Sequence, residues 1–354
     1  MNIFIIVTPL QILNAVEAQQ HFELKPEECM LCIIQGGNVI NFLQLAKVTD
    51  INDWGEIVLI PSTDPPLKNS KDNWFVTLSK RIKRFDSIKD IIKSLPEIDH
   101  VFLGEYRSEL MRHFANSLRC RELYLLDDGN ITIRMHEGRG KENDIITRHV
   151  GYSKSKNLVK RLIGLKDQPV KNLNYFTAYD LKPILNEKIV RNEYRYLRSH
   201  LKQFTRLDCI YFLGTELQSL FEEPMVKDDI YYRYLKRIKE YFSGQEVIYF
   251  PHRAEPIEKQ NFIESELNIK VKRLNIPIEN YLANTSQLPR YLAGFYSSAL
   301  YNGSIIFGSD IHIIAFSIKK EHISQSFRDE ITNVYGFYRM SHLEKFDVID
   351  LEEV

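Results

Sequence analysis

The sequence predicts an α/β protein of two Rossmann-like domains of similar size that face each other across a cleft. Three observations support this class. The chain has 354 residues, more than one hydrophobic core comfortably holds. Short apolar runs alternate with longer amphipathic stretches, which is typical of a parallel sheet covered by helices. The apolar runs are rich in β-branched residues, as expected of strands buried on both faces.

The alternation is regular in the first part of the chain. The predicted strands are residues 2–7, 29–34, 56–60, 100–104 and 122–127. The stretches with helical spacing are residues 8–19, 38–48, 74–95 and 108–118. The alternation lapses between about residues 130 and 190, where we expect an excursion followed by an interdomain linker.

The alternation resumes in a second α/β unit. Its predicted helices are near residues 188–204, 229–243, 256–266 and 323–340. Its predicted strands are residues 208–214, 246–251, 269–274, 292–297 and 304–308. We therefore place a first domain at 1–175 and a second domain at 176–330. The segment 331–354 is a candidate to pack back on the first domain.

Composition excludes several function classes. The 47 basic and 47 acidic residues cancel, and no basic stripe is interleaved with aromatics, so nucleic-acid binding is not indicated. Cys29 and Cys32 form a C-x-x-C without a second pair or nearby histidine, so we expect all four cysteines to be free thiols. The apolar N-terminus lacks a basic n-region, and Pro9 interrupts it. We expect a cytoplasmic protein.

Open α/β sheets bind ligands outside the carboxyl ends of their strands, so the polar residues after strands are the candidates. Asp127, Asp128 and Gly129 directly follow a predicted strand. A carboxylate there can act as a general base, with the glycine permitting a tight turn. A structural turn or helix cap uses the same residue types.

A second strand end carries Pro251, His252, Arg253 and Glu255. A histidine beside an arginine can bind a phosphate and stabilise charge that develops on it. The structural alternative is a histidine bonded to backbone groups, with Arg253 and Glu255 paired on the surface.

Two further strand ends offer ligand contacts. Ser297 and Ser298 would open a helix and cradle a phosphate with its free N–H groups, although serine caps are common. Glu279 could accept hydrogen bonds from both ribose hydroxyls, or serve as a first-turn helix acid. Thr8 and Gln11, after the first strand, could contact a sugar or form a helix cap.

The ordered set resembles the bacterial sialyltransferases of the lipooligosaccharide and capsular polysialyltransferase groups. That family shares a D/E-D/E-G motif, an HP motif and a serine pair, matched here by Asp127–Gly129, His252 and Ser297–Ser298. Segments 7–15 and 212–216 are similar to its first strand-to-helix turn and its glycine turn. In one departure, Arg253 stands where the family has proline.

The resemblance implies a GT-B arrangement and an inverting, metal-independent transfer from a CMP-activated nonulosonic acid, usually CMP-sialic acid, to a glycan hydroxyl. It implies no cofactor and no metal site. By this resemblance Asp127 is the base and Asp128 orients it or the acceptor, a ranking that the sequence leaves open. His252 serves the departing phosphate. The implied donor-binding residues are Gly214, Thr215, Arg253, Glu279, Ser297 and Ser298.

Alternatives remain at this stage. The donor could be CMP-Kdo or a UDP- or GDP-sugar, or the chain could be a non-catalytic nucleotide-binding component of a polysaccharide assembly complex. The basic stretch 154–166 is a solvated face or a contact to anionic lipid at the inner membrane surface. The acceptor, the linkage, single transfer versus polymerisation and the oligomeric state are not indicated.

Overall fold

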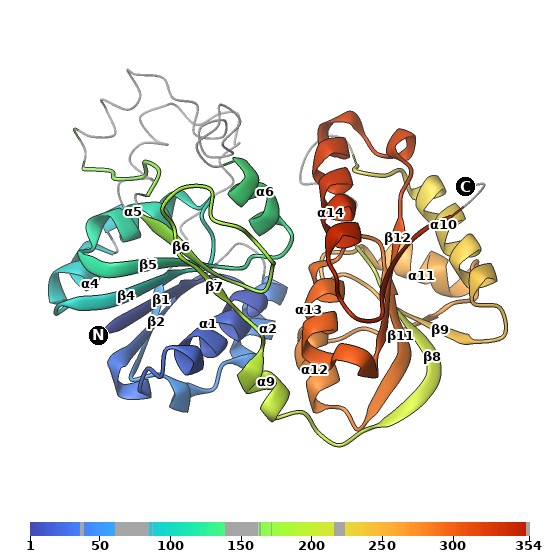
Figure 1. The fold of residues 1–354 in the computed structure, drawn as a ribbon, viewed down its shortest axis with the longest axis horizontal. Coiled ribbons are helices and arrows are strands. Elements are labelled where there is room, and N and C mark those ends of the chain that lie inside the picture. The colour runs from blue at the N-terminus through green and yellow to red at the C-terminus, as the bar shows by residue number, and fades with distance from the viewer. Residues whose placement is uncertain are drawn as a thin grey trace. The chain divides into compact units, whose positions relative to one another are not determined.

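The chain divides into two compact units, Met1–Asn192 and Glu193–Val354. The computed structural model describes residues 1–35, 39–60, 85–86, 88–138, 162, 164–170, 172–215 and 224–351. The division lies later than the boundary expected at 175/176, because that boundary falls inside a strand of the first sheet, Leu173–Thr177. Both units can be followed by colour in Figure 1.

The first unit contains a parallel sheet of seven strands in the order β3-β2-β1-β4-β5-β6-β7. Its strands are β1 (Asn2–Ile6), β2 (Cys29–Ile34), β3 (Glu56–Ile60), β4 (Ile98–Leu103), β5 (Cys120–Leu126), β6 (Leu173–Thr177) and β7 (Ile189–Arg191). The five strands predicted in this part of the sequence are all present. The chain reverses its direction of strand addition between β1 and β4, which is the topological switch point of such a sheet.

Helices cover both faces of this sheet (Figure 1). Alternate residues of β1 point to opposite faces: Ile3 and Ile5 join one buried cluster, whereas Phe4 and Ile6 join the other. The helices are α1 (Pro9–His21), α2 (Val39–Val48), α4 (Lys89–Ser94), α5 (Glu109–Ser117) and α6 (Ile131–Gly138). Side chains of α1 belong to the buried cluster that contains Phe4, and side chains of α5 belong to the cluster that contains Ile3.

The stretch expected to be an excursion and a linker instead supplies two strands, β6 and β7. All five residues of β6 are buried, and it pairs with β5 on one side and β7 on the other. No described helix joins β6 to β7, so the strand–helix rhythm that identified the other strands is missing here. The helix expected near 188–204 is only partly present: β7 takes the start of this range, and the helical part is limited to the short α9 (Arg195–Ser199).

The second unit contains a parallel sheet of six strands in the order β10-β9-β8-β11-β12-β13. The strands are β8 (Thr205–Leu213), β9 (Glu246–Phe250), β10 (Lys270–Val271), β11 (Gln287–Gly294), β12 (His312–Ser317) and β13 (Phe346–Asp350). Its switch point lies between β8 and β11. The segment 331–354 belongs to this unit, because β13 pairs with β12.

Besides α9, the described helices of the second unit are α10 (Asp228–Tyr241), α11 (Ile257–Ser265), α12 (Ile278–Asn284), α13 (Ser298–Phe307) and α14 (Arg328–Met340). The strand expected at 304–308 is wrong, because residues 304–307 complete α13. A short apolar run fits a buried strand and a buried helix equally well, and α13 is buried over almost its whole length. The next strand is β12.

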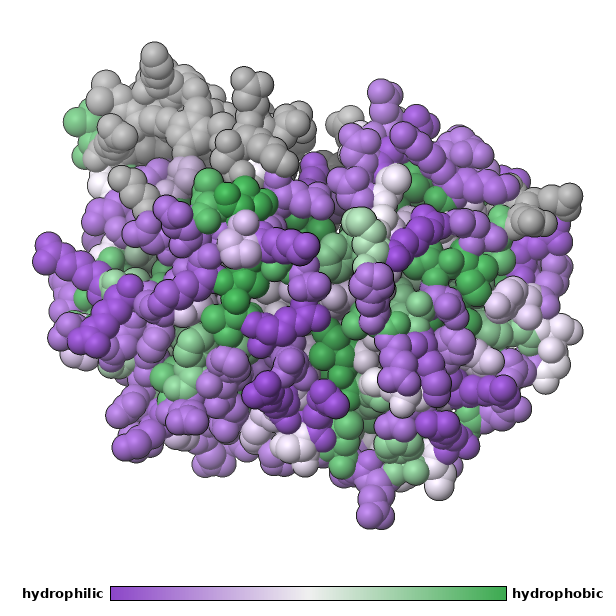
Figure 2. Space-filling view, in the orientation of Figure 1, coloured by the Kyte–Doolittle hydropathy of each residue, from purple (hydrophilic) through white to green (hydrophobic). Residues whose placement is uncertain are grey.

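Hydrophilic side chains cover most of the face shown in Figure 2, with hydrophobic ones in small areas between them. Within the described ranges, no helix combines the length and the apolar character that a membrane span needs.

Candidate functional site

Two adjacent carboxylates follow β5 in the first unit. The strand ends at Leu126, and Asp127 and Asp128 come directly after it. Gly129 has a φ of 77°, a backbone conformation that glycine adopts without steric cost. The tight turn expected from Asp-Asp-Gly is therefore present, and it holds both carboxylates at the carboxyl end of the sheet.

Asp127 is buried, with 2% of its surface exposed. Its Oδ2 accepts a hydrogen bond from the Ala178 N–H at 2.7 Å, and its backbone carbonyl accepts one from Asn14 Nδ2 at 3.0 Å. Burial raises the pKa of Asp127 from 3.8 to about 6 and outweighs the neighbouring donors, led by Ala178, that lower it. Among the described residues, Oδ1 has no hydrogen-bond partner of good geometry. Asp127 thus changes protonation in the range that suits a general base.

Two described side chains hold the Asp128 carboxylate. Its Oδ1 accepts from Gln11 Nε2 at 2.8 Å, and its Oδ2 lies 3.4 Å from a guanidinium nitrogen of Arg107. The same guanidinium lies 2.8 Å from Glu105 Oε1. The Asp128 side chain is 16% exposed, so it is more accessible than Asp127 while its orientation is fixed.

Thr8 and Gln11 form the cap of α1, the alternative that the sequence left open for them. Thr8 Oγ1 accepts from the Gln11 N–H at 3.3 Å, and the Gln11 side chain accepts from the Thr8 N–H in return. This reciprocal pair is a capping box, and the Thr-x-x-Gln spacing is its sequence signature. The Gln11 side chain is fully buried and also bonds Asp128, a role that the sequence did not indicate.

In the second unit, three neighbouring strands end level with one another. Phe250 of β9 pairs with Leu213 of β8, and Leu213 pairs with Gly294 of β11. The candidate residues that follow these strands are Gly214, His252 and Ser297. Because paired strands lie about 4.8 Å apart, the three strand ends fall within roughly 10 Å. The register therefore brings together motifs that are scattered along the sequence.

His252 lies in the turn after β9. Its Nδ1 accepts a hydrogen bond from the Ala254 N–H at 3.3 Å, so the neutral imidazole carries its proton on Nε2. Burial, followed by the charge of Arg253, lowers the pKa of His252 from 6.5 to about 4. In the unliganded protein at neutral pH, His252 is therefore an uncharged hydrogen-bond donor through Nε2.

Glu255 anchors the His252 turn from inside the unit. Glu255 is 6% exposed, so the surface pair with Arg253 that the sequence allowed is not what the structure shows. Its carboxylate accepts from the Tyr249 hydroxyl at 2.7 Å and from the His252 N–H at 3.2 Å, and it lies 3.6 Å from Lys259 Nζ. The i, i+4 spacing of Glu255 and Lys259 is a signal that was available in the sequence.

Gly214 is needed for this network. A Cβ atom at Gly214 would lie 2.5 Å from the Tyr249 hydroxyl and 2.7 Å from Glu255 Oε2. The absence of a side chain therefore makes room for buried protein groups, and an approach of nucleotide to its backbone stays a proposal. Thr215 is 8% exposed, and in the described part of the chain its hydroxyl has no hydrogen-bond partner.

The serine pair opens α13, as the sequence predicts. Ser297 is the N-cap, and its hydroxyl accepts from the Ala299 N–H at 3.3 Å. The Ser297 carbonyl accepts from the Tyr338 hydroxyl at 3.0 Å, so α14 fixes this turn. Ser298 is the first residue of the helix. The amino end of α13 is a favourable place for an anion.

Glu279 lies in the first turn of α12, where it is 6% exposed. Its Oε1 accepts from Asn302 Nδ2 of α13 at 3.0 Å. Burial raises the pKa of Glu279, whereas Asn302 and the positive charge of Arg253 lower it. The influence of Arg253 on both His252 and Glu279 indicates a cation close to the two candidate ligand-binding side chains.

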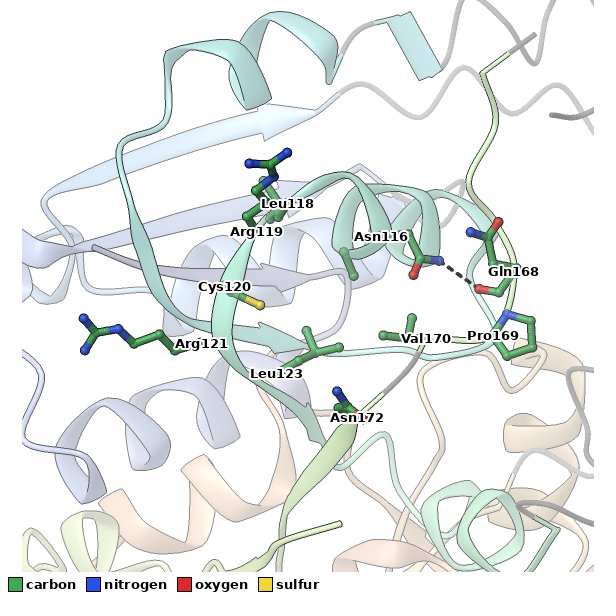
Figure 3. A pocket seen from close by; sticks show the side chains of 11 residues that line it. Asn116, Leu118, Arg119, Cys120, Arg121, Leu123, Gln168, Pro169, Val170 and Asn172 are labelled. Atoms are coloured by element: carbon green, nitrogen blue, oxygen red, sulfur yellow. Dashed lines mark hydrogen bonds between the residues drawn. The ribbon is translucent and has the colours of Figure 1, made fainter. Parts of the chain in front are cut away.

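A cavity of about 410 Å³ lies elsewhere in the first unit, beside Cys120 at the amino end of β5 (Figure 3). Its lining includes Asn116, which donates to the Gln168 carbonyl at 2.9 Å, and Arg119 and Arg121, which extend away from it (Figure 3). None of its described lining residues is a carboxylate or a histidine. It is therefore separate from the candidate site at the other end of the same strand.

The remaining predictions concern metals, thiols and the basic stretch. In the parts of the chain that the structure describes, no group of three or more His, Cys, Asp or Glu side chains could hold a metal ion. The four cysteines are free thiols, and all but the partly buried Cys120 are buried. Of the basic residues in 154–166, Lys154, Lys156, Lys160 and Arg161 lie outside the described residues.

No protein-family model matches the chain. The chain is similar to the N-acetyllactosaminide alpha-2,3-sialyltransferase of Haemophilus influenzae, with 25% identity over 286 residues, covering 75% of this chain and 79% of that protein. The fold of this chain is similar to that of Arabidopsis thaliana UGT89C1 complexed with UDP, with 10% identity and a TM-score of 0.53. The alignment covers 99% of this chain and 86% of that one. The GT-B domain of the Photobacterium damselae sialyltransferase aligns with a TM-score of 0.47 and 12% identity, over 99% of this chain and 100% of that one.

The two-domain GT-B-type fold predicted from the sequence is confirmed. The curated relative and the shared fold together support a glycosyltransferase enzyme. The bonding of the candidate residues adds two expectations about stability.

Gly214→Ala should destabilise the second unit by about 1–3 kcal/mol, because the new Cβ atom would displace the Tyr249 hydroxyl and the Glu255 carboxylate from their buried positions. Gly336→Ala is the matched control: nothing lies within 4 Å of its Cβ position in α14, and alanine favours a helix by up to about 1 kcal/mol. Thermal unfolding should show a lower Tm for the first variant and an equal or higher Tm for the second. Equal Tm values for Gly214→Ala and the wild type would contradict the packing described.

Asp127→Asn should stabilise the protein at neutral pH. The folded-state pKa of Asp127 is raised from 3.8 to about 6. The protonated Asp127 side chain therefore contributes its full stability to the folded wild type below about pH 4, and this stability is lost as the pH rises through 6. Asparagine keeps an acceptor for Ala178 without that loss, which amounts to a gain on the order of 1–3 kcal/mol. Unfolding followed at pH 4 and pH 8 should show the advantage only at pH 8. An advantage of the same size at both pH values would refute the buried-charge explanation.

Proposed function

We propose that the protein is an inverting, metal-independent glycosyltransferase. It transfers sialic acid, or a related nonulosonic acid, from a CMP-activated donor to a glycan hydroxyl of lipooligosaccharide, capsule or a similar surface glycan. The observation that carries the proposal is the level ending of β9, β8 and β11, which groups His252, Gly214 and Ser297 at one sheet edge. The sialyltransferase named among the curated relatives supports this choice of donor.

The second unit would bind the CMP part of the donor. His252 donates through Nε2 to a phosphate oxygen, and Ser297 with the first N–H groups of α13 binds the others. Ser298 and Arg253 add a hydroxyl and a positive charge. Because a bound phosphate is negative, it raises the pKa of His252 above its unliganded value of about 4. The imidazole can then follow the growth of charge on the departing phosphate.

Glu279 would bind the ribose. Its Oε1 already accepts from Asn302, which fixes the carboxylate and turns its remaining acceptor capacity to a ligand. Two vicinal ribose hydroxyls are donors that match a single carboxylate. Thr215 would be an additional donor-side contact through its enclosed hydroxyl.

The first unit would supply the base. Asp127 is the better candidate than Asp128, because its pKa of about 6 lies close to the working pH. Asp128 already accepts hydrogen bonds from Gln11 and Arg107, so it suits the binding of the acceptor sugar. Asp127 takes the proton of the acceptor hydroxyl while the oxygen forms a bond to the anomeric carbon. The bond from that carbon to the phosphate oxygen breaks, and CMP leaves from the opposite side.

The setting of this reaction is also a proposal. We place the protein in the cytoplasm. We further propose that the basic stretch 154–166 contacts the inner face of the cytoplasmic membrane. The rival donors are CMP-Kdo and UDP- or GDP-sugars, and the rival class is a non-catalytic nucleotide-binding component. The donor assay below separates them.

Purified protein should release CMP from CMP-sialic acid in the presence of a galactose-terminated acceptor. Asp127→Asn should lower turnover at least about a hundredfold, and His252→Ala should lower it more than Ser297→Ala, because His252 stabilises charge that grows in the transition state. Parallel assays with CMP-Kdo, UDP- and GDP-sugars identify the donor. Release from CMP-Kdo alone would reject the sialic acid donor. CMP binding by a wild type that transfers no sugar would favour the non-catalytic component.

The rate should fall as the pH drops through about 6, by up to tenfold per pH unit, because protonated Asp127 cannot accept the acceptor proton. His252 stays neutral in the free protein above about pH 4, so this limb of the profile reports Asp127. The pH profile of kcat/KM for wild type and Asp128→Asn should share this limb. Its loss in Asp128→Asn, with retention in Asp127→Asn, would assign the base to Asp128.

A further inference from the structure

Helix α1 presents two buried amides to the carboxylate turn after β5. Gln11 and Asn14 are three residues apart, so they lie on one face of the helix, and both are fully buried. Asn14 Nδ2 donates to the Asp127 carbonyl at 3.0 Å, and Gln11 Nε2 donates to Asp128 Oδ1 at 2.8 Å. One helix thus fixes the backbone of the first aspartate and the side chain of the second.

The orientation of the Gln11 amide is determined by the backbone around it. Its Oε1 accepts from the Val7 N–H at 2.7 Å and from the Thr8 N–H at 3.3 Å. Rotating the amide by half a turn would set its NH₂ group against these two donors and its oxygen against the carboxylate of Asp128. Only the observed orientation satisfies all three neighbours, so Nε2 always faces Asp128.

Gly104, which follows β4, provides the space for this amide. A Cβ atom at Gly104 would collide with Gln11 Oε1 and lie 2.5 Å from its Cδ. The Gly104 N–H donates to the Ile5 carbonyl of β1 at 2.8 Å, so the backbone cannot move aside without breaking the β1–β4 junction. The glycine and the glutamine therefore form one unit at the switch point of the first sheet.

We propose that Gln11, in the space left by Gly104, is a positioning residue that fixes Asp128 for binding the acceptor sugar. The inference rests on the proposed function, and it assigns Gln11 a role through Asp128 in place of direct contact with a sugar. Among the described residues, the charged groups at this point are Asp128, to which the amide donates, and Arg107, whose guanidinium pairs with both Asp128 and Glu105. Gln11 is the neutral donor among them.

Gln11→Glu tests the contact without relying on activity. The new carboxylate can still accept from Val7 and Thr8, but it faces Asp128 without a donor, so the two carboxylates must share a proton. The pair then has a raised folded-state pKa, and its stability is lost as the pH rises. The Tm of Gln11→Glu should therefore fall further below that of the wild type at pH 8 than at pH 5. Gln20→Glu is the matched control, because it makes the same chemical change on the exposed face of α1 and should show no such dependence.

Kinetics test the positioning role. Gln11→Glu and Gly104→Ala should raise the acceptor KM about tenfold to a hundredfold, because this is the affinity that one hydrogen bond to a charged group provides. The donor KM should stay within about twofold of the wild-type value. Gly104→Ala keeps the test decisive if Gln11→Glu does not fold. An unchanged acceptor KM in a folded variant, or a Tm difference that is the same at pH 5 and pH 8, would overturn the inference. A wild type that releases no CMP from any donor contradicts the proposed function instead, while the unfolding test still decides whether Gln11 faces Asp128.

Discussion

Both sheets depend on one constraint, the parallel direction of all their strands. Each strand therefore presents its carboxyl end at the same edge of its sheet, and side chains far apart in sequence meet there. In the second unit the register makes three such ends level, with Phe250, Leu213 and Gly294 in one row. In the first unit, Gln11 after β1 reaches Asp128 after β5 past the end of the intervening β4.

The candidate residues at these edges combine burial with charge, which the folded protein tolerates only through specific partners. Burial raises the pKa of Asp127, Glu255 and Glu279, so ionising each of them costs folding free energy. Their partners differ: a backbone N–H for Asp127, a tyrosine and a lysine for Glu255, and an amide for Glu279. Destabilised groups of this kind are typical of functional sites. The His252 turn is one example, because the buried Glu255 carboxylate accepts the hydrogen bond from the His252 N–H and so holds the turn.

The sequence predicted the features that depend on local pattern. Buried β-branched runs identified β1, β2 and β9, and the Asp-Asp-Gly and Ser-Ser pairs correctly predicted a turn after β5 and the start of α13. It did not predict β6 and β7, because no helical stretch separates them, or the helical state of residues 304–307, because a short apolar run has no decisive period. Apart from the local pairs Thr8–Gln11 and Glu255–Lys259, the sequence did not indicate the partners of the candidate residues. Tyr249, Asn302 and Gly104 acquire their roles only when the sheets bring strand ends together.

The two amides on α1 have a consequence for how this region can change during evolution. A helix turns by about 100° per residue, so one residue inserted between β1 and Gln11 would carry both Gln11 and Asn14 away from the β5 turn together. Length changes in the β1–α1 connection are thus far more damaging than substitutions on the outer face of the helix, such as at the exposed Gln20. Homologues that keep this arrangement should therefore vary freely only at the exposed positions of α1, while conserving the number of residues between the first strand and the glutamine.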